Sequence, residues 1–207
     1  MVNQCGASDL PWHGRGTELD IWGCRFSFYP MNDSFVSIIT EALEKTRTDA
    51  VWSSIDALST VYRGRLPFVV DAARGLFVNA YCSDVHMVIE GQFSKGCPGD
   101  TDGDSYLALD GEPPNLPRVR DVHFPAIAKI ALYPLGTENY IDGIAHVFRM
   151  AEDAGLNPKI IHYATRIEGD IHEIFDYLEA ACGYAATVAS HFALTFTVSV
   201  NSPSLEV

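Results

Sequence analysis

The stretch HFALTFTVSV, residues 191–200, places an apolar side chain at every second position. The stretch VHMVIEGQFS, residues 85–94, alternates in the same way, and His86 and His191 stand at equivalent positions of the two stretches, 105 residues apart. Strict alternation predicts a strand with one face packed on helices and the other face polar. The same strand is therefore expected twice in this chain.

A shift of 105 residues aligns much of the second half of the chain with the first. The aligned pairs are Thr60 with Thr165, Gly64 with Gly169, Asp71 with Asp176, His86 with His191, Ser94 with Ser199, and Pro98 with Pro203. The pairs Tyr29-Pro30 and Tyr133-Pro134 align at 104, which requires one slip of a single residue. A repeat of this length is a small domain, because solenoid units repeat every 20–50 residues or so.

Each repeat has the periodicity of strand, helix, strand, strand, helix, strand. In the first repeat the strands are predicted over 24–29, 51–55, 58–63 and 85–94, and the helices over 35–43 and 68–78. In the second repeat the strands are predicted over 130–133, 160–163, 165–168 and 191–200, and the helices over 140–154 and 171–183. Pro30 and Pro134 are expected to stop the first strand of each repeat.

This order predicts an α+β fold class, a tandem repeat of two ferredoxin-like βαββαβ domains. The expected domains cover residues 20–98 and 126–203. The segment between them, 99–125, is rich in Gly, Pro and Asp and is predicted to be a linker.

The net charge of the chain argues against several classes of partner. The chain has 207 residues, with 14 Lys and Arg against 27 Asp and Glu, and its net charge is −13. Such a charge repels nucleic acid and anionic membranes, and it is compatible with a cationic or neutral small ligand. The five cysteines are odd in number and lack a C-x-x-C spacing, so they predict neither a disulfide framework nor a zinc site. Without a signal-peptide pattern or a run of about 18 apolar residues, a cytoplasmic location is expected.

The polar faces of the two last strands hold the first candidate site residues. His86 recurs as His191, and Ser94 recurs as Ser199. These residues could form one ligand site in each repeat. Alternatively, they could be retained on a solvated or interface face after the duplication. No acid, base and nucleophile recur together, so a hydrolytic triad is not supported and no catalytic residue is expected.

Thr60 and Thr165 are the second candidates, each on the third strand of its repeat. A threonine hydroxyl both donates and accepts a hydrogen bond, which suits a heteroaromatic ring with an amino group beside a ring nitrogen. Strand pairing is expected to fail near Pro30 and Pro134, which would leave the carbonyls of Phe28 and Leu132 free to accept a ligand hydrogen bond. The alternative is that threonine occurs there as a good strand former.

The other motifs in the sequence give little support for a metal, nucleotide or RNA site. The run Asp100-Thr101-Asp102-Gly103-Asp104 suggests calcium, but an EF-hand needs Gly and Glu where this chain has Ser105 and Gly111. The scattered glycines form neither a Walker A nor a dinucleotide motif, so no cofactor and no metal are expected. An RNA-binding RRM domain shares the element order, but its basic aromatic strand motif is missing.

Several strings in both repeats together resemble the YkoF family of thiamin/hydroxymethylpyrimidine-binding proteins. The strings are CRFSFYPMNDSFVSII, VWSSIDALSTVYRG, DAARGLF and FSKGCPGDTDGDSY in the first half, and ALYPL, HYATRIEGD and VNSPS in the second. The resemblance runs from about Cys5 to Ser204. The stretch 1–23 is longer than the family pattern, and residues 10–19 within it are expected to be an insertion.

The resemblance implies a homodimer and non-catalytic binding of thiamin or its hydroxymethylpyrimidine precursor, with one ligand per repeat. It implies ligand contacts from Phe28 and Thr60 in the first repeat and from Leu132 and Thr165 in the second. The family's association with an ABC-type transporter implies a role in uptake or salvage and transporter components as partners. An ACT-like regulatory module that binds another metabolite, and a cofactorless oxygenase of the α+β-barrel type, remain as alternatives.

Overall fold

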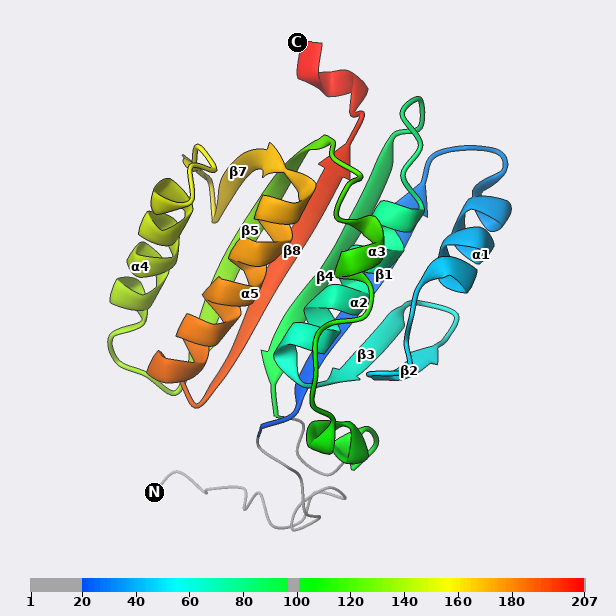
Figure 1. Ribbon diagram of the computed structural model, residues 1–207. Helices are drawn as coiled ribbons and strands as arrows, with labels where there is room; N and C mark the ends of the chain where they lie inside the picture. The colour runs from blue at the N-terminus through cyan, green and yellow to red at the C-terminus, as the bar shows by residue number, and fades with distance from the viewer. Residues whose placement is uncertain (1–19, 97–100, 207) are drawn as a thin grey trace.

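Each half of the chain folds in the order strand, helix, strand, strand, helix, strand (Figure 1). The first half contains β1 (Trp22–Pro30), α1 (Phe35–Lys45), β2 (Trp52–Ile55), β3 (Thr60–Gly64), α2 (Leu66–Asn79) and β4 (Met87–Lys95). The second contains β5 (Pro125–Leu135), α4 (Tyr140–Asp153), β6 (Lys159–Ile161), β7 (Ala164–Asp170), α5 (Ile171–Val188) and β8 (His191–Val200). Three short helices complete the described part of the chain: η2 (Asp104–Ala108), α3 (Leu116–Val119) and η3 (Pro203–Glu206).

This computed structural model describes residues 20–96 and 101–206. The insertion expected over 10–19 lies outside the described residues, as does Asp100 of the acidic run. In the described segments, no helix combines the length and the apolar character needed to cross a membrane.

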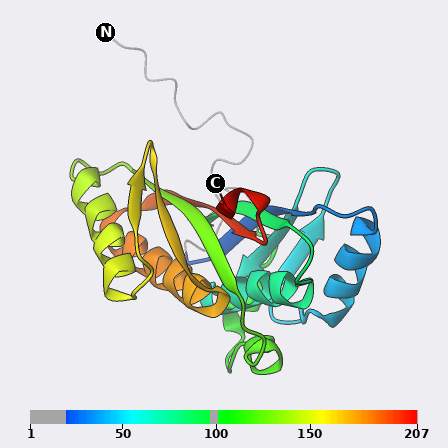
Figure 2. The same ribbon diagram turned by 90° about the horizontal axis from the view of Figure 1, so that it is seen from above.

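The eight strands form one antiparallel sheet in the order β2-β3-β1-β4-β8-β5-β7-β6. The four long helices lie on the same side of this sheet, as the view from above shows (Figure 2). The alternation predicted for β8 is confirmed, because Phe192, Leu194, Phe196, Val198 and Val200 are all buried beneath the helices. The chain is thus a mixed α/β protein with one helix-covered face and one face that the described helices leave open.

The two halves join where β4 pairs with β8. Gly91 lies opposite Phe196 in this pairing, and these two residues are equivalent in the 105-residue repeat. Since an antiparallel pair has a local two-fold axis, the two repeats are related by a pseudo-two-fold axis at this seam. The two copies of any site therefore lie on opposite sides of the β4–β8 seam.

Of the elements that extend beyond their predicted bounds, β5 and α5 do so furthest. β5 begins at Pro125 and continues through Pro134 to Leu135, so the prediction that Pro134 stops it is wrong. Pairing with β7 on one side and β8 on the other overrides the weak strand propensity of its alanines. α5 continues past Gly183 to Val188, and the ring of Tyr184 stacks on His146 at a centroid distance of 4.0 Å.

The segment between the repeats is anchored to the first repeat. Asn115 is buried, its backbone and side-chain N–H groups donate to the Asp71 carboxylate of α2, and its Oδ1 accepts from Arg47 N at 2.7 Å. Gly75 permits this approach, because a Cβ there would lie 2.7 Å from Asn115 Cβ. The recurring Asp71 and Asp176 are accordingly structural: Asp176 pairs with the buried Arg74, between α5 and α2.

Candidate functional site

The two candidate threonines lie on the helix-covered face of the sheet. Thr60 is paired with Phe26 of β1, and Thr165 is paired with Ile130 of β5. Residues directly opposite one another in antiparallel strands project from the same face. Phe26 and Ile130 belong to the core beneath the helices, so both threonines point into the layer between sheet and helices. Each is partly buried.

Phe28 and Leu132 also project from the helix-covered face, because they follow Phe26 and Ile130 by two residues along their strands. Leu132 is buried, and the ring of Phe28 packs edge-on against Phe77 at 5.8 Å between centroids. The structure therefore brings the predicted apolar and hydroxyl residues of each repeat together on one face, in neighbouring strands.

The two histidines lie on the opposite, open face. His86 Nε2 is 3.0 Å from Ser199 Oγ of β8, and His191 Nδ1 is 3.3 Å from Lys95 O of β4. Both contacts cross the seam between the repeats. The structure does not bring His86 or His191 to the threonines, and it gives them a geometry suited to joining the two halves of the sheet.

The variant His86→Ala is expected to lower the free energy of unfolding by about 1 kcal/mol, the net value of one partly buried hydrogen bond. The affinity for any ligand that contacts Thr60 is expected to stay at the wild-type value, because the histidine and Thr60 project from opposite faces. Urea denaturation and calorimetry measure the two quantities on the same preparation. A large loss of affinity with unchanged stability would instead show that His86 contacts the ligand.

Backbone groups of Phe28 face an open strand edge. The hydrogen bonds Met31 N to His86 O (2.9 Å) and Gly96 N to Ile21 O (2.7 Å) fix which residues of β1 bond to β4. By alternation, Phe28 directs its N–H and C=O away from β4. The pairing of β3 with β1 ends at Phe26, so no ladder partner meets these groups on that side. The register of β1 with β3 and β4 therefore leaves the Phe28 carbonyl without a partner among the described strands, as the sequence predicted.

The same edge occurs in the second repeat. The hydrogen bond Ile171 N to Phe124 O (3.1 Å) shows that even-numbered residues of β5 bond towards β7. Pairing with β7 ends at Ile130, while pairing with β8 continues to Leu135. Leu132 therefore presents its N–H and C=O to an unpaired edge. Pro134 fits in the strand for the same reason, because its missing N–H would have faced that edge.

A cavity of about 750 Å³ lies against this edge, between α4, the end of β5 and the hairpin of β6 and β7. Its volume is within the range of small-molecule sites, and its lining is mostly apolar. Leu132 and Thr165 both line it, which places these two predicted residues in one site. The other lining residues include Ile130, Leu135, Ile141, Ile144, Phe148 and Ile161.

Aromatic side chains surround the mouth of the cavity. Tyr140 and Tyr163 line it and are exposed, and Tyr163 at the hairpin tip is 96% exposed. Tyr163 has a φ of 67°, which is uncommon for a residue with a side chain. Exposed tyrosine rings offer a face to a flat or cationic ligand.

The corresponding surface of the first repeat has the same elements with different side chains. Phe35 and Val36 of α1, and Ile55 and Leu58 of the β2–β3 hairpin, are exposed at the positions equivalent to Tyr140, Ile141, Ile160 and Tyr163. This hairpin is held by Asp56, whose carboxylate accepts from the Leu58 and Ser59 N–H groups at 2.8 Å. Hydrogen bonds from Leu58 and from the Arg25 guanidinium lower the pKa of Asp56. The equivalent residue in the second hairpin is Ile161, so the two hairpins are stabilised differently.

Sequence reasoning missed the contribution of α4. Its side chains Tyr140, Ile144 and Phe148 line one wall of the cavity, and Arg149 lies beside them. The sequence signal for this contribution was the apolar stripe along 140–154, which is wider than a helix needs to cover one buried face. Arg149 is equivalent to Glu44 in the first repeat, so one position carries opposite charges in the two halves.

Nucleophilic chemistry finds little support among the described cysteines. Cys24 and Cys182 are free and fully buried, and burial raises the pKa of each thiol well above its ordinary value. A thiol in such surroundings stays protonated and is a poor nucleophile.

Comparison with known proteins gives matches of different strength. The model of the YKOF-related family matches the chain twice, over residues 21–100 and 125–205. A Bacillus subtilis (strain 168) protein named "Putative HMP/thiamine-binding protein YkoF" is 41% identical over 184 residues, which cover 89% of this chain and 92% of that protein. A solved Thermotoga maritima structure titled as a "putative thiamine biosynthesis/salvage protein" aligns with a TM-score of 0.36 and 18% identity, over 41% of this chain and 96% of its own.

The two family matches cover both repeats of the sheet, and the relative from Bacillus subtilis covers nearly the whole chain. The resemblance expected from the sequence strings is confirmed, and the chain belongs to the YKOF-related family.

Proposed function

We propose that this protein binds thiamin or its hydroxymethylpyrimidine precursor without catalysis, at one site in each repeat. The observation that carries the proposal is the cavity in which Thr165 and the unpaired edge of Leu132 meet. The name of the Bacillus subtilis relative supports the choice of ligand.

The aminopyrimidine ring complements this cavity. Its amino group donates a hydrogen bond, and the adjacent ring nitrogen accepts one. Leu132 presents an N–H and a C=O on the same side of β5, and Thr165 adds a hydroxyl that can donate or accept. The flat ring would lie between apolar walls, here Ile144 and Phe148. A few polar groups in an apolar site are the usual means of fixing a ligand's orientation.

The second ring of thiamin is a cationic thiazolium, for which the two repeats offer different surroundings. In the second repeat, the exposed ring of Tyr163 can hold a cation, while Arg149 opposes it. In the first repeat, Glu44 replaces the arginine and favours a cation. We therefore propose that the two sites have unequal affinities.

The strand order within each half, β2-β3-β1-β4 and β8-β5-β7-β6, supports the assignment of two ferredoxin-like domains over 20–98 and 126–203, with 99–125 as the linker. The face of the sheet that the described helices leave open is our proposed contact for a homodimer. A role in cytoplasmic uptake or salvage of the vitamin precursor, with components of an ABC-type transporter as partners, completes the proposal.

Calorimetric titration with thiamin, its phosphates and hydroxymethylpyrimidine tests the function. The expected result is close to two ligands per chain, in two steps of different affinity, with no product formed. A parallel thermal-shift screen with amino acids serves as the control for a regulatory module. Stabilisation by an amino acid, with none by thiamin or the pyrimidine, would contradict the proposed function.

A further inference from the structure

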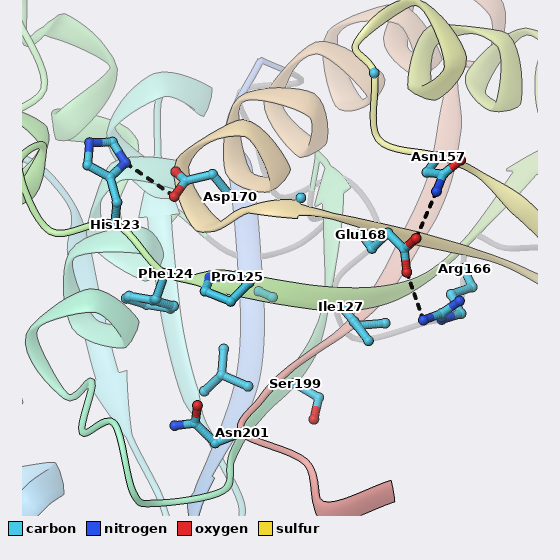
Figure 3. Close-up of a pocket in the computed structure, with 14 residues that line it drawn as sticks. His123, Phe124, Pro125, Ile127, Asn157, Arg166, Glu168, Asp170, Ser199 and Asn201 are labelled. Atoms are coloured by element: carbon cyan, nitrogen blue, oxygen red, sulfur yellow. Dashed lines mark hydrogen bonds and ion pairs between the residues drawn. The ribbon is translucent and has the colours of Figure 1, made fainter. Parts of the chain in front are cut away.

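Two histidines and an aspartate meet at the start of α5, away from the pyrimidine cavity. They are His123, which precedes β5, and Asp170 and His172, which flank the first residue of α5. One ligand atom from each of the three lies within 4.8 Å of the others. His123 and Asp170 line one end of a second cavity of about 820 Å³, and Figure 3 shows their side chains pointing toward one another, away from Arg166 at the other end.

The tautomer of His172 is fixed by a backbone carbonyl. Its Nε2 is 3.0 Å from Val122 O, and a carbonyl oxygen only accepts, so Nε2 carries the proton. In the neutral ring, Nδ1 then carries a lone pair. His172 is only 9% exposed, and its Nδ1 is buried without a hydrogen-bond partner among the described residues. Histidines that bind metals characteristically donate their other ring N–H to a carbonyl in this way.

The remaining two groups are placed beside one another. His123 Nδ1 is 3.2 Å from Asp170 Oδ2. The other oxygen, Asp170 Oδ1, accepts from His172 N at 3.0 Å and caps α5. Oδ2 keeps a lone pair for a further partner. The positive end of the α5 dipole opposes a cation here, and the Asp170 carboxylate offsets it.

The backbone beneath this cluster is held by several hydrogen bonds. Glu173 completes a capping box by accepting from Asp170 N at 3.1 Å, and Ile171 N donates to Phe124 O at 3.1 Å. The segment that carries His123 is therefore tied to the first turn of α5. A ligand set held in this way needs little rearrangement to bind an ion.

We propose that His123, Asp170 and His172 bind a divalent transition-metal ion of the zinc class, with a fourth position open to the cavity. Two imidazole nitrogens and one carboxylate suit Zn²⁺ or Co²⁺, whereas Ca²⁺ and Mg²⁺ prefer oxygen ligands alone. The net charge of −13 favours cation binding. The site belongs to the second repeat only, because the first has Arg65 and Pro67 at the positions of Asp170 and His172.

Titration of chelator-treated protein without a polyhistidine tag tests the site, with Zn²⁺ followed by calorimetry and Co²⁺ by its visible absorption. The wild type is expected to bind one ion per chain. His123→Gln is expected to weaken binding at least tenfold or so, since even the loss of a second-shell partner costs roughly 10- to 100-fold. The matched control is His162→Gln, which removes an exposed histidine from the β6–β7 hairpin and is expected to leave the affinity unchanged.

His172→Gln is the second ligand variant, and it is expected to weaken binding to a similar degree. Because His172 is buried, that variant could lose stability, whereas the His123 side chain is 64% exposed and its replacement leaves the core intact. Absence of saturable binding, or equal affinities of the wild type and His123→Gln, would overturn the proposal.

Discussion

The variant Thr165→Val is expected to weaken thiamin binding at the second-repeat site roughly tenfold to 100-fold while leaving the first-repeat site unchanged. Valine has nearly the same shape as threonine and is a good strand former, so the pairing of β7 with Ile130 is retained. The ligand group that bonded to the hydroxyl is left unsatisfied in a desolvated cavity, which costs about 1–3 kcal/mol. Calorimetric titration measures the change step by step.

Two further valine variants sharpen this experiment. Thr60→Val should affect the other binding step, and the double variant should affect both. Thr197→Val is the matched control, because Thr197 also lies in a strand but projects from the open face. Equal affinities in the wild type and in Thr165→Val would show that the hydroxyl does not contact the ligand. A change in both steps from one single variant would contradict the assignment of one site to each repeat.

The variant Asp71→Ala is expected to lower the free energy of unfolding by about 3 kcal/mol and the melting temperature by roughly 6–12 °C. The Asp71 carboxylate is 3% exposed and accepts three hydrogen bonds: from Asn115 N and Nδ2 at 2.8 Å and from Leu116 N at 2.7 Å. Its removal leaves the backbone N–H groups of Asn115 and Leu116 without this acceptor, and the Asn115 amide keeps only its bond to Arg47 O. Each loss of a partner in a buried position is costly. Urea and thermal unfolding provide the measurement.

Asp71→Asn is the graded control. The amide keeps one acceptor oxygen but adds a donor where another donor already points, so an intermediate loss of stability is expected. A further control is Asp110→Ala, which removes an exposed carboxylate paired with Arg65 and should cost less than about 1 kcal/mol. A loss below 1 kcal/mol for Asp71→Ala would show that the segment around Asn115 contributes little to stability.

Alternation and internal repetition predicted most of the architecture. Apolar and polar side chains alternate over residues 191–200 because β8 has helices on one face only, so the face that is buried can be predicted from the sequence. The match of Thr60 with Thr165 identified equivalent positions correctly, since both pair with the first strand of their repeat. The open edge at Leu132 could be anticipated from Pro134, although the proline permits the strand to continue instead of stopping it.

Other features depend on contacts between distant residues and leave little trace in the sequence. Asn115 occurs in a segment with the composition of a linker, yet it is buried because Asp71 and Arg47 satisfy its polar groups. His123 is 47 residues from Asp170, a separation that no local metal motif would reveal. The wall that α4 contributes to the cavity could not be predicted, because it depends on which side of the helix faces the sheet.

The central place of β8 has a consequence for how this protein is made. β8 is the last of the described strands, yet it lies between β4 and β5 and pairs with both. During synthesis, β4 and β5 therefore leave the ribosome with adjoining edges exposed, and these edges stay open until residues 191–200 emerge. Unpaired edges invite association between chains. Loss of β8 would thus divide the sheet at its centre and expose the unpaired edges of β4 and β5 at once.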